Sequence, residues 1–230
     1  MKLKKLRLIG RGGVWKVFRL GDQKHVFRVP FGSTEYSIQR FIENHKIVKE
    51  LGLPTLAKVE RLEFNNEIGI RCEDLNISGL KVYVTYNSLY SDSDRKKDKE
   101  MEALGGPKRG KRTFSKAEQR RHRYKLTELT GFERFLKDVK TTLDSVTLKN
   151  VGIDFDSYFF GTINDASQSP IDYIIADLDH ILSYPDAAYD EILENNYSEF
   201  NRAMTGFLKN FVKPAHRREY LDALNLHIPA

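Results

Sequence analysis

The segment "IGRGGVWKVFRL", residues 9–20, places Gly10, Gly12 and Gly13 directly before a strand-like apolar run. Glycine lacks a side chain, so its backbone N–H groups can approach a phosphate closely. The same freedom suits any tight turn between two strands. The cluster alone therefore leaves two interpretations open, a phosphate-binding loop and a plain hairpin turn.

Two later segments, "GIDFDSYFF" and "YIIADLDHI", place aspartates beside short apolar runs. Asp154 and Asp156 belong to the first segment, and Asp177 and Asp179 belong to the second. A hard cation accepts carboxylate oxygens as ligands, which is one use for such residues. An aspartate that ends a buried strand is also often a turn former or a helix cap, so this alternative stays open.

The composition indicates a globular chain that is long enough to bury a core. Its 230 residues are 40% hydrophobic and 30% charged, and this length permits one domain or two small ones. The sequence has no apolar run long enough to span a membrane, and the apolar stretch before Arg11 is too short for a secretory signal. The single cysteine, Cys72, excludes an intramolecular disulfide and a cysteine-cluster zinc site. We therefore expect a reducing, cytoplasmic compartment and no membrane span.

The positive charge of the chain is concentrated in one insert, residues 94–125. This insert holds 13 Lys or Arg against 5 Asp or Glu, a local net charge of +8, whereas the whole chain carries +6 and the remainder therefore −2. Such a run is typical of a mobile surface loop. The alternative is binding to an acidic partner, which could be a protein, a lipid or, less favoured, a nucleic acid.

The first third of the chain predicts three strands, a helix and two more strands. The strands are expected in "KLKKLRLIG", "VWKVFRL" and "KHVFRVP", because these runs alternate or are rich in β-branched and aromatic residues. Ser33 is expected to cap the helix, which Gly52 and Pro54 end. The last two strands, "LAKVERLEF" and "IGIRCEDL", are joined by an Asn65-Asn66 turn.

The second half of the chain is expected to be mainly helical. An apolar stripe in "TGFERFLKDVKTTLDSV" predicts a long buried helix, and residues 186–224 return to helical periodicity. Between them, the two aspartate segments are predicted to form short buried strands around a polar turn.

The order of these elements, ending in a carboxylate-bearing loop, a strand and "ADLD", resembles the protein kinase fold over nearly the whole chain. Kinases carry G-x-G-x-x-G-x-V in the first strand pair, and Gly10, Gly12 and Val17 match it in register. Trp15 takes the place of the third glycine, where its bulk could shield the γ-phosphate of ATP or block it. The resemblance implies that Val17 covers the adenine ring.

The third kinase strand ends in a lysine that contacts the phosphates and pairs with a glutamate of the following helix. Arg28 and Glu43 take these places, and arginine keeps the charge while differing from lysine in length and shape. Lys16 and Lys24 are substitutes for this role, and the alternative for Arg28 is an ordinary surface ion pair. The resemblance adds three further nucleotide-binding residues: Gly13, Val26 and Glu73.

The aspartate segments resemble the two acidic motifs of kinases. Asp154 matches the aspartate that orients the acceptor hydroxyl, and Asp177 matches the Asp-Phe-Gly aspartate that holds magnesium. Phe159, or Tyr158 if the loop is one residue shorter, stands where the catalytic-loop asparagine would be, and Asp156 could supply the missing oxygen ligand. Asp179 replaces the glycine of Asp-Phe-Gly and is a further candidate for a metal ligand.

We therefore expect an α+β, kinase-like fold of two lobes. Residues 1–75 form a five-stranded antiparallel sheet with one helix, and residues 76–230 form a reduced, mainly helical lobe. Only 51 residues follow Asp179, which resembles the reduced kinases that pathogenic bacteria secrete as effectors into the host cytosol.

The implied activity is phosphoryl transfer from ATP, with magnesium, to a Ser, Thr or Tyr hydroxyl of a protein substrate, with Asp154, Asp177 and Arg28 as catalytic residues. One alternative is a pseudokinase that acts as a binding module, which Trp15, Arg28, Asp179 and the missing asparagine favour. Another is a small-molecule kinase, because compact kinase-like folds also phosphorylate sugars, antibiotics or lipids.

Overall fold

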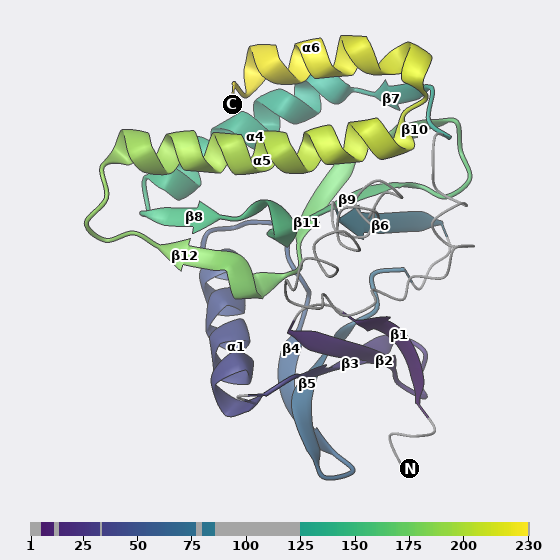
Figure 1. The fold of residues 1–230 in the computed structure, drawn as a ribbon, viewed down its shortest axis with the longest axis vertical. Helices are drawn as coiled ribbons and strands as arrows, with labels where there is room; N and C mark the ends of the chain where they lie inside the picture. The colour runs from purple at the N-terminus through teal and green to yellow at the C-terminus, as the bar shows by residue number, and fades with distance from the viewer. Residues whose placement is uncertain (1–5, 12–13, 33, 77–79, 86–124, 230) are drawn as a thin grey trace, which may run out of the picture.

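Figure 1 shows the chain as a computed structural model that describes residues 6–11, 14–32, 34–76, 80–85 and 125–229. A five-stranded sheet with one helix beside it forms one part of the molecule, and three long helices stacked over small sheets form the other. The expected α+β fold, with its five-stranded antiparallel sheet and mainly helical second lobe, is confirmed. The boundary between residues 75 and 76 stays a prediction.

The five-stranded sheet has the strand order β1-β2-β3-β5-β4, and every neighbouring pair is antiparallel. Its strands are β1 (Arg7–Arg11), β2 (Trp15–Arg19), β3 (His25–Pro30), β4 (Val59–Phe64) and β5 (Glu67–Glu73). The predicted Asn65-Asn66 turn joins β4 to β5, and both residues adopt the positive φ angles, 53° and 64°, that asparagine tolerates well.

Helix α1 (Thr34–Glu50) packs against one face of this sheet. Its apolar residues Ile38, Phe41 and Val48 recur at helical spacing, and all three are fully or almost fully buried. The helix ends at Gly52, whose φ of 70° lies in the left-handed region that glycine adopts without strain. The predicted cap residue, Ser33, lies outside the described residues.

Within the described residues, the second part contains three α-helices: α4 (Phe132–Thr147), α5 (Tyr189–Phe211) and α6 (Arg217–His227). Each contacts the other two, and Figure 1 shows α5 lying across the small sheets with α6 above it. The predicted helical tail is divided between α5 and α6, because Pro214 lacks the N–H that a continuous helix needs. Phe200 and Phe207 on α5 are buried against the strands below.

The two aspartate segments form more strands than the sequence pattern predicts. Strands β11 (Asp172–Ile175), β9 (Tyr158–Ile163) and β6 (Lys81–Thr85) form one antiparallel sheet, and β12 (Ile181–Ser183) pairs with β8 (Val151–Ile153). A second two-stranded sheet joins β10 (Gln168–Pro170) to β7 (Glu128–Thr130) in parallel. Short 3-10 turns follow β8 and β11, at Phe155–Ser157 and Leu178–His180, and these two turns carry the aspartates.

The basic insert lies outside the described residues, apart from Lys125, whose ammonium contacts the Asp165 carboxylate. Its expected mobility and its acidic partner therefore stay predictions. In the part of the chain that the structure describes, no helix is long and apolar enough to cross a membrane.

Candidate active site

The two aspartate-bearing turns are hydrogen-bonded to each other. The Asp154 N–H donates to the His180 carbonyl at 3.2 Å, and the Ala176 N–H donates to the Ser157 carbonyl at 3.1 Å. The Ser157 hydroxyl also donates to the Asp177 carbonyl at 2.8 Å. Asp154 and Asp177, which are far apart in the sequence, are thereby held on adjacent turns.

Arg28 joins the five-stranded sheet to the Asp177 turn. Its guanidinium donates to the Ala176 carbonyl at 3.0 Å and lies 3.4 Å from Asp177 Oδ1. The guanidinium carbon also lies 4.6 Å from the centre of the Phe41 ring on α1. With 12% of its side chain exposed, Arg28 is held in an enclosed position, so the alternative of an ordinary surface pair is wrong.

The other two basic candidates do not face this aspartate. Lys16 pairs with Val29 on β3, so it lies on the opposite face of the sheet from Arg28, and its ammonium sits 4.9 Å from the centre of the Phe31 ring. Lys24 lies in the exposed turn between β2 and β3. The structure therefore assigns the contact with Asp177 to Arg28 among these three residues.

Trp15 and Asp179 form the second link between the sheet and the acidic turn. The indole N–H of Trp15 donates to Asp179 Oδ2, and Trp15 is 3% exposed. The indole ring also packs edge-on against Phe41 at 5.5 Å. Burial raises the pKa of Asp179, and the neighbouring Asp177 carboxylate raises it further. Asp179 thus accepts a hydrogen bond from Trp15, a residue of the segment 9–20 that contains Gly10, Gly12 and Gly13.

The Asp154 carboxylate lies beside His180 and Glu199. Its Oδ1 is buried without a hydrogen-bond donor among the described residues, and its Oδ2 lies 3.6 Å from His180 Nδ1. Glu199 of α5 accepts the Phe155 N–H at 3.0 Å and lies beside Asp154. Burial and the adjoining Asp154 carboxylate raise the pKa of Glu199.

Two buried asparagines position these turns, and the sequence analysis missed both. Asn44 on α1 donates to the Leu178 carbonyl at 2.5 Å. Asn196 on α5 accepts the Ile153 N–H at 2.9 Å and donates to the Val151 carbonyl at 3.0 Å, which anchors the strand that leads to Asp154. The sequence could have indicated Asn196, because this polar residue lies on the same helical stripe as the apolar residues Ile192 and Phe200.

Two predicted acidic residues point elsewhere. Glu43 is exposed and accepts a hydrogen bond from Gln39 at 2.9 Å, so the expected pair with Arg28 is not formed. The neighbouring residue, Asn44, is the one that faces the acidic turn. The Glu73 carboxylate accepts the Ala57 N–H at 2.6 Å and so braces the segment before β4.

The remaining nucleotide candidates lie along the first strands. Val17 pairs directly with Arg28 across β2 and β3, so their side chains share one face, and Val26 lies on the same face and is buried. Gly10 pairs with Val17 at an irregularity in β1. The other two glycines, Gly12 and Gly13, lie outside the described residues.

Asp177 and Asp156, two of the acidic residues predicted to hold magnesium, are both partly exposed. Asp177 is 31% exposed, and Asp156 lies partly exposed on the adjoining turn. Within the described ranges, no group of three or more His, Cys, Asp or Glu residues is arranged to hold a metal ion. Because Mg²⁺ commonly uses one or two carboxylates and completes its shell with water and phosphate, these residues fit such a partial site.

No protein-family model matches the chain, and a search of curated proteins found no match. Solved structures with a similar arrangement include the Helicobacter pylori proinflammatory kinase CtkA, with 14% identity, coverage of 98% of this chain and 93% of that chain, and a TM-score of 0.43. Another is the ADP-bound aminoglycoside phosphotransferase APH(2'')-Ib, with 11% identity, coverage of 98% and 78%, and a TM-score of 0.39. The streptomycin-ATP-APH(2'')-IIa ternary complex matches with 12% identity, coverage of 97% and 79%, and a TM-score of 0.36. Kinase-like neighbours are what the sequence analysis expects, but at these identities and scores they transfer no activity or site residue to this chain.

Proposed function

We propose that this protein transfers a phosphoryl group from ATP to a hydroxyl acceptor, with magnesium as cofactor. The observation that carries the proposal is the contact of Arg28 with Asp177, on a turn that is hydrogen-bonded to the turn of Asp154. A cation and two carboxylates on three separate segments converge only because the sheet and the helical part meet here. Phosphoryl transfer needs this combination, since its catalysis depends on positioning and on neutralising charge.

Each residue has a distinct role in the proposal. Asp177, with Asp156, would hold magnesium, which when bound neutralises charge on the phosphates. Arg28 would bind phosphate oxygens through its fork of N–H donors. Asp154 would accept a hydrogen bond from the acceptor hydroxyl and so orient it. Val17 and Val26 would contact the adenine ring from the sheet.

The acceptor that we propose is a Ser, Thr or Tyr hydroxyl of a protein. The basic insert, residues 94–125, would then favour an acidic partner through its local charge of +8. A small hydroxylated molecule is the alternative acceptor, which the assay below includes.

A pseudokinase is the second candidate function, and one observation favours it. Arg28 contacts Asp177 and Trp15 donates to Asp179, so each of these charged side chains already has a partner at one of its atoms. A binding module can keep such a closed arrangement permanently, whereas an enzyme must open it.

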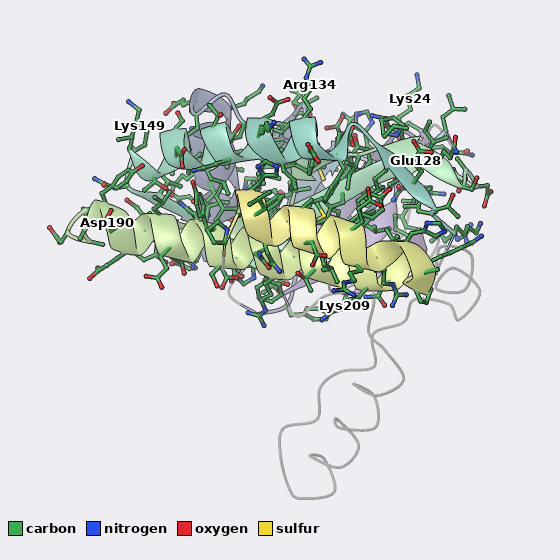
Figure 2. All side chains as sticks on the ribbon, turned by 90° about the horizontal axis from the view of Figure 1, so that it is seen from above. Lys24, Glu128, Arg134, Lys149, Asp190 and Lys209 are labelled. Carbon is green, nitrogen blue, oxygen red and sulfur yellow. The ribbon has the colours of Figure 1, made fainter. Side chains whose placement is uncertain are left out.

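The test is incubation with γ-labelled ATP and magnesium, with the protein itself, casein, a cell lysate and an aminoglycoside as acceptors. Wild type is compared with Asp177→Ala, and Asp190→Asn serves as the matched control. Figure 2 shows Asp190 in the first turn of α5, at the end of the molecule where Lys149 also lies, and its side chain is exposed. Transfer by wild type and Asp190→Asn, but not by Asp177→Ala, supports the enzyme. Binding of ATP, measured by calorimetry, without transfer to any acceptor supports the pseudokinase. Absence of ATP binding refutes the enzyme and a nucleotide-binding pseudokinase, and leaves a module that binds a protein.

A further inference from the structure

Trp15 is the only tryptophan of the chain and stands where the kinase motif has its third glycine. It is the first residue of β2, and its indole is 3% exposed. Because side chains alternate along a strand, Trp15 and Val17 lie on the same face of the sheet, which is also the face of Arg28. The Trp15 indole therefore lies on the same face of the sheet as Arg28, at a position where the kinase motif has a glycine without a side chain.

The indole ring contacts both sides of the proposed phosphate site. Its N–H donates to Asp179 on the acidic turn, and its ring centre lies 5.4 Å from the guanidinium carbon of Arg28. Phe41 of α1 packs against both the indole and the guanidinium. Trp15 thus contacts both the Arg28 guanidinium and the Asp179 carboxylate, beside the direct contact of Arg28 with Asp177, where the proposed function places the phosphates.

The charged groups of this cluster are enclosed as well as paired. Arg28 is 12% exposed, donates to the Ala176 carbonyl, and has its Nε buried without a hydrogen-bond acceptor among the described residues. A buried donor without a partner is costly, so Arg28 has an unused N–H that a phosphate oxygen could satisfy. The Trp15 and Phe41 rings both lie against this guanidinium, with ring centres 5.4 and 4.6 Å from its carbon.

We propose that Trp15 and Asp179 form a latch that holds the nucleotide site closed, and that nucleotide binding displaces the indole from Asp179. In this proposal, which rests on the proposed function, Asp179 is the acceptor that seats Trp15 rather than a metal ligand. Only the open molecules bind ATP, so the apparent Kd equals the Kd of the open state divided by the fraction of molecules that are open. The latch leaves the contacts of the bound nucleotide unchanged.

The single tryptophan makes the latch directly observable. In the free protein, Trp15 emission should be that of a shielded indole, with slow quenching by acrylamide. Addition of magnesium and the non-hydrolysed analogue AMP-PNP should move the emission to longer wavelength and accelerate quenching. The readout concerns the position of Trp15 and needs no phosphoryl transfer.

Variants separate the latch from a metal site. Asp179→Ala removes the acceptor, and Trp15→Phe keeps the ring contacts but removes the N–H donor. Each should bind AMP-PNP about tenfold more tightly than wild type, measured by calorimetry, because the closed state no longer competes. Asp179→Asn keeps an oxygen for the indole N–H, so its affinity should stay closer to that of wild type than to that of Asp179→Ala. If Asp179 were a metal ligand, both Asp179 variants would bind more weakly.

Three outcomes decide the proposal. Tighter binding by Asp179→Ala and Trp15→Phe, together with greater exposure of Trp15 on binding, supports it. Binding of AMP-PNP with unchanged Trp15 emission and no gain in affinity overturns the latch and leaves the proposed function standing. If neither wild type nor any variant binds nucleotide, the proposed function and the latch both fail. Because Trp15→Phe preserves the ring packing, a folding defect in one variant leaves the other to decide.

Discussion

Replacing Arg28 by methionine tests whether the contact with the Asp177 turn holds the two parts of the protein together. Methionine is an unbranched apolar side chain that can occupy part of the space of the Arg28 stem, but it lacks the guanidinium group, whose carbon lies 5.4 Å from the Trp15 ring centre and 4.6 Å from the Phe41 ring centre. The change removes the hydrogen bond to the Ala176 carbonyl and the ion pair with Asp177.

The magnitude follows from these two losses. Ala176 is 3% exposed, so its carbonyl loses a donor in a buried place, which costs about 1–3 kcal/mol of unfolding free energy. The carboxylate of Asp177 is 31% exposed and can be hydrated, so its unpaired charge adds only about 0.5–1 kcal/mol. From these two losses, Arg28→Met should lower the free energy of unfolding by about 1.5–4 kcal/mol, and the lost contacts of the guanidinium with the Trp15 and Phe41 rings add to this.

Urea denaturation followed by circular dichroism measures this loss, with Arg61→Met as the matched control. Arg61 lies on β4 of the same sheet and pairs with Glu35 at 3.3 Å, but the two side chains are 46% and 63% exposed. The control should lose less than about 0.5 kcal/mol, because such exposed pairs contribute little. An equal loss in both variants would show that Arg28 does not join the sheet to the acidic turn.

Four further predictions concern the same framework. Asp154→Asn should reduce phosphoryl transfer about a hundredfold while nucleotide affinity changes little, because the role is felt mainly in the transition state; equal transfer rates would remove Asp154 from the mechanism. Asn196→Ala should cost about 2–4 kcal/mol in thermal or urea unfolding, since a buried amide that bonds to the β8 backbone is lost. Gly69→Ala should cost about 2–3 kcal/mol, because the new Cβ would lie 2.3 Å from the Arg28 carbonyl oxygen, and a stable variant would contradict the register of β3 and β5. For Asp22, burial acts to raise the pKa, but hydrogen bonds from the next turn residues lower it from 3.8 to about 2. The ionised group therefore stabilises the fold above pH 3.8, and this contribution is lost as the pH falls through about 2. The free energies of unfolding of wild type and Asp22→Asn, from urea denaturation, should differ by under about 1 kcal/mol at pH 6, and the difference should shrink as the pH falls towards 2.

The amino-acid sequence by itself determined the local elements of this protein. Residue types that favour strands, turns and helices act over a few neighbours, so the five strands, α1 and the Asn65-Asn66 turn were predictable. The positions of the four aspartates at the ends of short apolar runs could also be identified from the neighbouring residues alone. The side-chain and backbone contacts that join Arg28, Asp154 and Asp177 could only be expected through the resemblance to kinases, because no local pattern encodes them.

Tertiary packing alone decided which side chains meet in the site. Glu43 and Asn44 are consecutive on α1, and because successive residues of a helix point about 100° apart, only one of them can face the acidic turn. The packing of α1 on the sheet turned Asn44 inward to the Leu178 carbonyl and left Glu43 in solvent. In the same way, the sequence alone does not determine whether Trp15 points to solvent or inward. The indole lies inward because Arg28 of β3, Phe41 of α1 and Asp179 after β11 are brought together around it.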